Sequence, residues 1–424
     1  MLNSVTQHVR NRITATDWSL VRGSALISIG MGIARALGFA FSLVLARAFT
    51  PGDYGKIQYA IAVAGVVAIA TQPFVQHVLA RFIGKHQNDM LALRQVITNV
   101  WGVLLALVVA TLVVAVPVLL VLQRFNIGII LIFLGTTLFY SYWGVASGFL
   151  SPGRLTTAYL GSNVVQIVLT LLLIQVLAIR SPLLAMAIYG LSYLLPIFAL
   201  QIVKPFPIRF QPALFDMAQI RRLVSFAVPI WLSHAAYSLY VAVDIILLEY
   251  FTDDATVGVY SLARTVALIF SFIPAGISTI LMPKIASLPA EKHGHLLRNM
   301  LALSLLANAA LLAVYLLLGE WFVRTTVGPA YLSDRKVLLI LAAETILSGI
   351  QSLITAVLVG SNRARIDMAS RVATLVVAAL ACWYLIPLFG AVGAAGAKLA
   401  GVLGAFIAYA ILLLPRWGAL RQSR

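Results

Sequence analysis

Residues 20–60 read LVRGSALISIGMGIARALGFAFSLVLARAFTPGDYGKIQYA, which is an apolar span, a short turn and the start of a second apolar span. Between Gly23 and Ala46 the only formal charge is Arg35. A helix rises about 1.5 Å per residue, so a span of this length crosses the roughly 30 Å hydrocarbon core of a bilayer. The stretch therefore predicts a transmembrane hairpin whose first helix carries an arginine in its middle.

The overall composition predicts a membrane protein with many spans. Of the 424 residues, 62% are hydrophobic and 10% are charged, and the mean hydropathy is +1.00. Neither a soluble globular domain nor a disordered chain has this composition. The net charge of +17 does not indicate nucleic acid, because the basic residues are scattered between apolar spans, as membrane orientation requires. We therefore expect no nucleic-acid partner.

No cofactor or metal site is expected. The single cysteine, Cys382, lies in an apolar segment, which excludes an intramolecular disulfide and a cysteine metal cluster. The histidines show no metal-binding spacing, and no Walker motif is present. The first twenty residues are polar, and the apolar span after them is too long for a signal peptide, so we expect this span to be retained.

Apolar runs separated by charged or turn residues predict twelve transmembrane helices. They cover residues 21–48, 55–80, 94–120, 127–150, 155–179, 183–203, 223–250, 257–282, 298–318, 336–359, 367–388 and 391–414. The longest connection contains three prolines and four basic residues and is expected to link two six-helix lobes. The predicted parts are a cytoplasmic N-terminal segment (1–20), an N-terminal lobe (21–203), the cytoplasmic linker (204–222), a C-terminal lobe (223–414) and a cytoplasmic tail (415–424).

The charges of the loops predict the orientation of the chain. If the N-terminus is cytoplasmic, twenty Lys and Arg residues lie on the cytoplasmic side and seven on the outer side. Cytoplasmic loops of membrane proteins carry the excess of basic residues. Both termini are therefore expected in the cytoplasm.

Two pairs of motifs indicate an internal repeat. Residues 46–60 (ARAFTPGDYGKIQYA) and 248–263 (LEYFTDDATVGVYSLA) both place Phe-Thr at the end of one helix and then Gly, an aromatic residue and Ala at the start of the next. Residues 150–154 (LSPGR) and 359–363 (VGSNR) form a weaker second pair. Because six helices separate the members of each pair, the two lobes are expected to form a parallel repeat that encloses a pathway.

The hairpin at residues 20–60, together with the helix count, the repeat and the linker, resembles the polysaccharide-export flippases of the Wzx type. These belong to the multidrug/oligosaccharidyl-lipid/polysaccharide (MOP) exporter superfamily. The sequence motif is strong only in that hairpin, where Thr50 stands in place of the glycine that is usual in the family. The resemblance implies an all-α, MATE-like fold of two six-helix lobes that works by alternating access.

The resemblance also implies a function. Proteins of this type move undecaprenyl-pyrophosphate-linked oligosaccharide repeat units across the bacterial cytoplasmic (inner) membrane for lipopolysaccharide or exopolysaccharide synthesis. The expected partners are then the lipid-linked oligosaccharide and the lipid bilayer. H⁺ or Na⁺ is a candidate coupling ion, and the polysaccharide polymerase machinery is a candidate protein partner. No covalent chemistry is expected, so no catalytic residue is predicted.

Five charged residues lie within the predicted spans, away from their ends: Arg35, Asp244, Arg264, Glu344 and Lys398. A lipid-facing charge at a helix centre costs about 2.5 to 3.5 kcal/mol, so five would cost about 12 to 17 kcal/mol. That sum rivals the whole stability of a typical domain, about 5 to 15 kcal/mol. All five side chains are therefore expected to face protein, water or one another.

Two interpretations remain open for the four charges of the C-terminal lobe, which lie at a similar depth. Static salt bridges would pair Asp244 with Arg264 and Glu344 with Lys398. Alternatively, the four side chains line a cavity. In that case Arg264 and Lys398 bind an anionic substrate, while Asp244 and Glu344 act in coupling to H⁺ or Na⁺.

Arg35 has no acidic partner within the spans of its own lobe. Its planar, permanently charged guanidinium suits phosphate oxygens, so Arg35 is the predicted pyrophosphate contact. The alternatives are hydrogen bonds to backbone carbonyl groups or extension of the side chain towards the membrane interface.

Several polar and aromatic side chains within the spans are candidate glycan contacts. They are Tyr140, Trp143, Tyr159, Asn163, Gln166, Tyr237, Tyr240 and Gln351. For the aromatic residues, helix packing is the competing interpretation. His234 is expected to be a core histidine rather than a proton carrier, and His77 is assigned to a loop.

Two other functions compete with lipid flipping. A cation-coupled multidrug antiporter of the same superfamily would favour an acidic cavity, whereas these spans carry three cations and two anions. A membrane-embedded polysaccharide polymerase or ligase would need a sizeable outer loop with catalytic groups, and the longest outer connection, Gly319 to Arg335, is short. The flippase is therefore the leading interpretation, and an enzyme is not expected.

Overall fold

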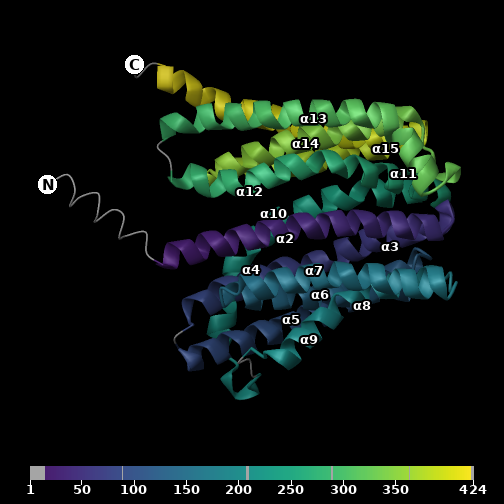
Figure 1. The fold of residues 1–424 in the computed structure, drawn as a ribbon. Coiled ribbons are helices and arrows are strands. Elements are labelled where there is room, and N and C mark those ends of the chain that lie inside the picture. The colour runs from purple at the N-terminus through teal and green to yellow at the C-terminus, as the bar shows by residue number, and fades with distance from the viewer. Residues whose placement is uncertain (1–14, 88, 207–209, 288–289, 362, 422–424) are drawn as a thin grey trace.

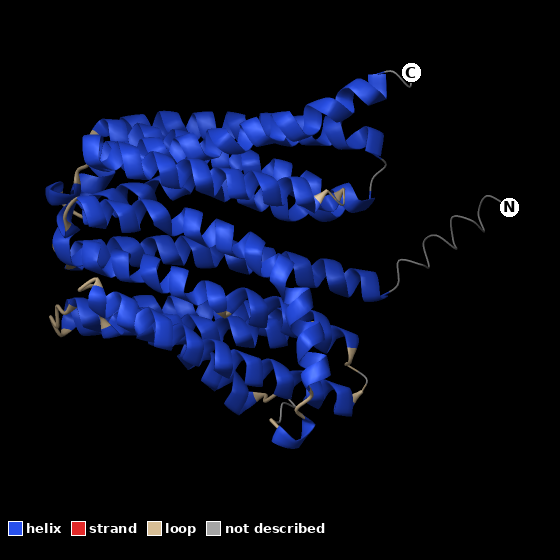
Figure 2. Cartoon of the chain, turned by 180° about the vertical axis from the view of Figure 1, so that it is seen from behind, coloured by secondary structure: helices blue, strands red, loops and turns tan. Residues whose placement is uncertain are grey.

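The computed structural model describes residues 15–87, 89–206, 210–287, 290–361 and 363–421, and these residues form helices and no strands (Figure 1; Figure 2). Of the predicted terminal and linker segments, residues 1–14, 207–209 and 422–424 lie outside this part of the chain. The lobe boundaries and the cytoplasmic side of the linker stay predictions.

Two halves of the chain, named here by their order in the sequence, lie side by side with their long helices roughly parallel (Figure 1). The helices of the N-terminal half are α2 (Ala15–Ala48), α3 (Pro51–Val67), α4 (Gln72–Lys85), α5 (Met90–Val121), α6 (Ile127–Gly148), α7 (Pro152–Leu169), α8 (Pro182–Ser192) and α9 (Leu194–Val203). Those of the C-terminal half are α10 (Met217–Phe251), α11 (Asp254–Ala267), α12 (Phe272–Ser287), α13 (Ala290–Thr326), α14 (Arg335–Gly360) and α15 (Ala364–Arg421).

The described helices account for the predicted spans. Ten of them are long and apolar enough to cross a membrane, and α3 and α4 together form an eleventh candidate that is bent by 48°. α15 consists of two helices joined at Gly390, whose φ of 54° is a value that glycine adopts readily because it has no Cβ. The break at Gly390 falls between the predicted spans that end at residue 388 and begin at 391. The prediction of about twelve helices is therefore confirmed.

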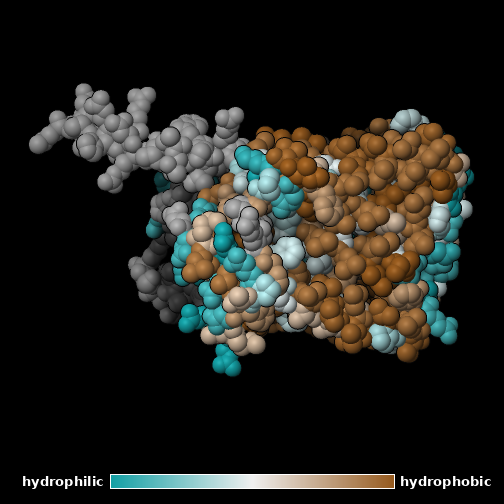
Figure 3. Space-filling model, turned by 90° about the horizontal axis from the view of Figure 1, so that it is seen from below, coloured by the Kyte–Doolittle hydropathy of each residue, from teal (hydrophilic) through white to brown (hydrophobic). Residues whose placement is uncertain are grey.

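The outer surface of the bundle is apolar along most of its length. Figure 3 shows hydrophobic side chains over the middle of one face and hydrophilic side chains towards both ends. Leu105 and Val113 on α5 and Leu317 on α13 are large apolar side chains that are exposed at this kind of surface. Such a belt is stable against lipid rather than water, so the chain is a multi-pass membrane protein.

The first hairpin is tighter than the sequence pattern predicts. α2 ends at Ala48 and α3 already begins at Pro51, so PGDYG forms the first turns of a helix rather than a loop. Thr50 caps this helix: its Oγ1 accepts a hydrogen bond from the Asp53 backbone N–H at 3.3 Å and donates to the Asp53 carboxylate at 3.1 Å. Proline suits its position because the N–H that it lacks would have no partner in the first turn of a helix.

The second predicted span, residues 55–80, is broken. A 3₁₀ turn at Ala68–Ala70 separates α3 from α4, and Pro73 in the first turn of α4 interrupts the helical hydrogen-bond pattern. α4 then continues to Lys85, so His77 lies within a helix. The assignment of His77 to a loop was therefore wrong.

The internal repeat brings two glycines into contact across the halves. Gly55 of α3 and Gly258 of α11 occupy equivalent positions in the repeated motif. A Cβ on Gly55 would collide with the carbonyl group of Asp254, and a Cβ on Gly258 would collide with the carbonyl group of Pro51. The first turns of the two helices thus touch backbone to backbone, which a residue with a side chain does not allow.

Polar contacts join the two halves at the same end of the bundle. Arg124, between α5 and α6, pairs with Glu249 of α10 at 2.5 Å. The hydroxyl of Tyr331 donates to the carbonyl oxygen of Phe49 at 2.9 Å. We call this end of the molecule the Thr50 end, and it lies opposite the two termini in Figure 1. The halves are closed against each other here.

Replacement of Gly258 by alanine tests the glycine contact. Gly258→Ala is expected to push α3 away from α11 and to lower the thermal unfolding midpoint of the purified protein, because overpacking typically costs about 1 to 3 kcal/mol. Gly32→Ala on α2 is the matched control, since a Cβ at that position meets nothing within 4 Å. Equal midpoints for the two variants would contradict the close contact.

Candidate functional site

A cavity of about 480 Å³ lies between the two halves of the chain. α2, α3, α4, α6, α7 and α8 form its walls on one side, and α10 and α11 form them on the other. Aromatic, hydroxyl and amide side chains make up most of its polar lining. Arg264 is the charged residue among the described side chains that line it.

Five aromatic rings of the N-terminal half form one wall of the cavity, which we call the aromatic wall. They are Phe139, Tyr140, Tyr159, Tyr189 and Tyr193. The Phe139 ring lies at the centre, with its centroid 5.0 Å from that of Tyr193, 5.7 Å from that of Tyr140 and 5.9 Å from that of Tyr159. Aromatic pairs with such spacings contribute about 0.5 to 1.5 kcal/mol beyond area burial. The wall therefore presents ring faces and hydroxyl groups in fixed positions.

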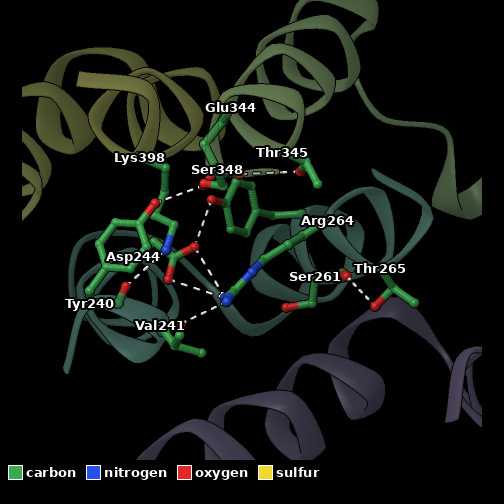
Figure 4. A network of polar contacts seen from close by, with 11 residues as sticks. Tyr240, Val241, Asp244, Ser261, Arg264, Thr265, Glu344, Thr345, Ser348 and Lys398 are labelled. Atoms are coloured by element: carbon green, nitrogen blue, oxygen red, sulfur yellow. Dashed lines mark hydrogen bonds and ion pairs between the residues drawn. The ribbon is translucent and has the colours of Figure 1, made fainter. Parts of the chain in front are cut away.

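Arg264 of α11 reaches the cavity from the opposite side. Its Nη1 donates to the Asp244 carboxylate at 3.2 Å, and its Nη2 donates to the Val241 carbonyl oxygen at 2.7 Å (Figure 4). The Tyr260 hydroxyl donates to the same carboxylate at 2.9 Å. The Arg264 side chain is 20% exposed, whereas Asp244 is fully buried. The predicted Asp244–Arg264 salt bridge is therefore confirmed, and part of the guanidinium remains open to the cavity.

Glu344 of α14 is buried and receives three hydrogen bonds. The donors are the hydroxyl groups of Tyr240 at 2.7 Å, Ser348 at 2.8 Å and Thr345 at 3.2 Å. Hydroxyl donors stabilise a carboxylate whose hydrogen bonds to water are removed by burial. Ser348 belongs to the polar stripe of Glu344 that recurs at helical spacing in the sequence, whereas Tyr240 comes from α10.

In the part of the chain that the structure describes, Lys398 of α15 forms no ion pair with Glu344, so this predicted salt bridge is wrong. The Lys398 Nζ instead donates to the carbonyl oxygen of Tyr240 at 2.8 Å and lies 3.4 Å from the centre of the Tyr240 ring. A cation over an aromatic face gains about 2 kcal/mol when it is desolvated. Tyr240 thus separates the acid from the amine and binds both.

These contacts form a network of four buried or partly buried charges whose formal sum is zero: Asp244, Glu344, Arg264 and Lys398. Among them Arg264 lines the cavity, while the other three lie behind its wall. Removing one partner of a buried pair typically costs about 3 to 5 kcal/mol. The network therefore fixes α10, α11, α14 and α15 together and presents one cation to the cavity.

Arg35 lies exposed on α2, outside the cavity lining. The structure gives it no hydrogen bond or ion pair among the described residues, so the predicted alternative of backbone carbonyl contacts is not seen. Its charge acts on the Tyr159 hydroxyl of the aromatic wall. One turn along the same helix, a Cβ on Gly38 would lie 3.3 Å from the Asn163 side chain of α7. Arg35 therefore lies beside α7, close to the cavity.

Three of the predicted glycan contacts line the cavity: Tyr140, Tyr159 and Tyr237. The others lie outside its lining: Trp143, Asn163, Gln166, Tyr240 and Gln351. Asn163 and Gln166 donate to the backbone carbonyl oxygens of Tyr159 and Tyr189, and the Tyr240 hydroxyl donates to Glu344. Each of these three side chains therefore makes a hydrogen bond within the protein.

Other residues of the cavity carried little sequence signal. Tyr189 and Tyr193 are four residues apart, a spacing that marks one helix face and that helical periodicity identifies. Gln58 and Gln72 are isolated amides on α3 and α4, and no pattern in the sequence distinguishes them. Among the described residues, no three His, Cys, Asp or Glu side chains are grouped to hold a metal ion.

A further buried acid lies near the other end of the C-terminal half. Asp367 accepts hydrogen bonds from Arg371 Nε at 2.8 Å and from the Thr355 hydroxyl at 2.5 Å. The Arg371 guanidinium lies 5.4 Å from the centre of the Tyr237 ring, which lines the cavity. Asp367 is the first residue of a predicted span, and for that reason it was not among the charges predicted within the spans.

No curated protein sequence matches the chain, but solved structures share its fold. An inward-facing multidrug resistance MATE family transporter of the MOP superfamily gives a TM-score of 0.70 at 14% identity and covers 94% of this chain and 98% of its own. The lipid II flippase MurJ in an inward closed conformation gives a TM-score of 0.70 at 16% identity, and the match covers 91% of this chain and 87% of the MurJ chain. An outward-facing multidrug resistance MATE family transporter of the MOP superfamily gives a TM-score of 0.58 at 15% identity, and the match covers 96% of this chain and 95% of the transporter chain.

At these identities the structural likeness shows the fold alone, and it confirms the predicted MATE-like, all-α architecture. The family described as "Polysaccharide biosynthesis protein" matches residues 20–289, which is more than half of the 424 residues. This match confirms the family resemblance seen in the first hairpin. The chain belongs to the polysaccharide biosynthesis protein family.

Proposed function

We propose that the protein is a flippase that moves undecaprenyl-pyrophosphate-linked oligosaccharide repeat units across the bacterial cytoplasmic membrane for surface polysaccharide synthesis. The observation that carries this proposal is the cavity between the halves, with the aromatic wall on one side and Arg264 on the other. Sugar rings need flat apolar faces and hydroxyl partners, and a pyrophosphate needs a cation. The cavity offers both kinds of contact within one space.

The size of the cavity is that of a ligand pocket. Its volume of about 480 Å³ lies within the range of about 300 to 1,000 Å³ that is usual for ligand pockets. The polyprenyl chain stays in the hydrocarbon layer, where it needs no protein pocket. Arg35, which lies exposed beside α7, would contact the pyrophosphate where the lipid enters, and Arg264 would receive it inside.

Alternating access requires the closed end of the bundle to open. The excess of basic residues on the loops at the other end supports an orientation in which the Thr50 end faces outwards. The Gly55–Gly258 contact and the Arg124–Glu249 pair would then form an outer gate. Release of the glycan on the outer side would need both contacts to separate.

The Asp244–Arg264 pair offers a way to couple this movement to an ion. An anionic substrate that binds Arg264 competes with the Asp244 carboxylate for the same guanidinium. A carboxylate that loses this partner gains affinity for H⁺ or Na⁺. Asp244 is therefore the acid that we assign to coupling. Glu344 keeps its three hydroxyl donors, which are not among the residues that line the cavity.

A cation-coupled multidrug antiporter is the second candidate function. Its support is the fold shared with MATE family transporters and the aromatic wall, which would also accommodate an organic cation. Against it, the charge that lines the cavity is Arg264, which repels cations. The anionic lipid-linked substrate therefore fits the cavity better.

Deletion of the gene separates the two functions. The flippase predicts that complete lipid-linked repeat units accumulate on the cytoplasmic side of the membrane, measured by extraction and mass spectrometry, while sensitivity to cationic drugs stays unchanged. Normal glycan export would overturn the proposal. Normal export together with increased drug sensitivity would establish the antiporter instead.

Arg264 is the variant that tests the substrate contact. Arg264→Gln is expected to reduce flipping about 10- to 150-fold, because a hydrogen bond to a charged group contributes about 1.5 to 3 kcal/mol. The double variant Arg264→Gln/Asp244→Asn is the control, since it leaves no unpaired acid. Flipping should stay low in the double variant. Recovery to the wild-type rate would mean that Arg264 serves only to neutralise Asp244.

Arg35 is expected to act on transport without a role in stability. Because the structure gives it no internal partner among the described residues, Arg35→Gln should leave the thermal midpoint unchanged and reduce glycan export at normal membrane levels. Arg324→Gln is the matched control, an exposed arginine whose contact is Glu320 at 3.9 Å. Unchanged export in Arg35→Gln cells would remove Arg35 from the substrate path.

A further inference from the structure

Two histidines from different halves of the chain face each other beside the cavity. His77 lies on α4 and His234 on α10, and their Nε2 atoms are 3.0 Å apart. The ring centroids are 4.9 Å apart and the ring planes are tilted by 54°. Tyr237, one helical turn after His234, lines the cavity. The imidazole pair therefore lies next to the proposed substrate space and joins the two halves.

The geometry of the pair depends on its protons. A hydrogen bond between two Nε2 atoms needs one N–H and one lone pair. A pair of neutral rings satisfies this condition, and so does one imidazolium that donates to one neutral ring. When both rings are protonated, each Nε2 carries a hydrogen and the two like charges repel. The contact is thus compatible with at most one imidazolium.

The histidine contact lies on a part of α10 that packs against the N-terminal half. Near its start, α10 is fastened to the N-terminal half: the Trp231 indole N–H donates to the Ile69 carbonyl oxygen at 2.7 Å, and Arg81 lies 4.2 Å from the centre of the Phe226 ring. Ile69 belongs to the break between α3 and α4, which leaves its carbonyl group free to accept. Further along, α10 is bound to α11, α14 and α15 by the charge network.

Of the contacts that fasten α10 to the N-terminal half here, the histidine pair is the one whose charge changes as the pH falls below about 6.5, the ordinary pKa of histidine. An indole hydrogen bond and an arginine over a ring keep their charge over this range. Protonation of both histidines therefore weakens one specific link between the halves and leaves its neighbours in place.

Burial, and then the charged side chains on the surrounding helices, disfavour a second proton on the pair. Arg371 of α15 acts electrostatically on His234 and has its own partner in Asp367 at 2.8 Å. α6 carries no charged residue. Other charges on the helices packed against α4 and α10 are Arg81 and Lys85 on α4, Arg94 on α5, Asp53 and Lys56 on α3, Arg221, Arg222, Asp244 and Glu249 on α10, Asp254 and Arg264 on α11, and Arg365 and Lys398 on α15. The positive charge of Arg371 makes a doubly protonated contact less stable still.

We propose that His77 and His234 form a proton-sensitive clasp between the two halves. The clasp holds α10 against α4 while the pair carries at most one extra proton, and it opens when both rings are protonated. The proposal concerns the conformation of the protein and does not depend on the identity of the transported substrate. It assigns to His234 a role in proton response that the sequence pattern did not favour.

Spin-label distance measurements on the full chain in lipid nanodiscs test the clasp. Labels at Lys85→Cys on α4 and Arg221→Cys on α10 are exposed, and Cys382→Ala removes the single native cysteine. The distance distribution is expected to shift to longer values only as the pH falls to about 4, because burial and the neighbouring charges oppose the second proton. The shift should be lost in His77→Gln and in His234→Gln, because neither pair can carry two charges.

The matched control is His86→Gln at the end of α4. The His86 Nδ1 lies 2.9 Å from the Phe82 carbonyl oxygen of its own helix, so this histidine has its contact within α4 rather than between the halves. This variant should keep the full shift. The clasp is refuted if the labelled wild-type sequence shows no shift, if both clasp variants retain it, or if His86→Gln abolishes it. If one clasp variant does not fold, the other carries the same test.

Discussion

A charge inside the hydrocarbon layer has to be neutralised and hydrogen-bonded where it lies, because no water reaches it. The C-terminal half meets this constraint with one tyrosine that serves two ions. Tyr240 gives its hydroxyl to Glu344 and its ring and carbonyl group to Lys398. Since these partners come from α10, α14 and α15, the positions of three helices depend on one side chain. Arg264 then adds α11 to the same network through Asp244.

The network and the glycine contact together determine the shape of the cavity. Gly55 and Gly258 bring the first turns of α3 and α11 into contact, and one turn later Gln58 and Ser261 already line the cavity. The cavity therefore begins one helical turn away from the glycine contact. Further along α11, Arg264 is held in place by Asp244, so the distance between the aromatic wall and the cation is set by the charge network on one side and by ring packing on the other.

The sequence predicted the parts of this arrangement that follow from periodicity and from energetic cost. Twelve spans, the break at Gly390, the repeat and the Asp244–Arg264 pair all follow from apolar runs or from charges that need partners. The depth of a residue along a helix does not give its direction around the helix. For that reason the pattern placed Lys398 opposite Glu344 and missed Tyr240 between them.

The contacts between the halves were least predictable. The histidine pair joins residues 157 positions apart, and no spacing rule relates α4 to α10. The start of α3 was missed for a local reason: a threonine cap and a following proline turn an apparent loop into helix. Tyr140, Tyr159 and Tyr237 could be predicted because they are polar aromatic residues within spans. Gln58 and Gln72 could not be predicted, because only the folded structure shows that they face the cavity.

The two-residue connection between α2 and α3 has a mechanical consequence. Phe49 and Thr50 form the whole connection, and Tyr331 binds the Phe49 carbonyl group, so the tip of the hairpin is a fixed point for a tilt of α2. Arg35 lies 15 residues from Thr50, about 22 Å along the helix, and a tilt of about 5° at the tip swings it by about 2 Å. A small rotation at the tip would therefore displace the Arg35 charge more than it displaces the residues near the Gly55–Gly258 contact.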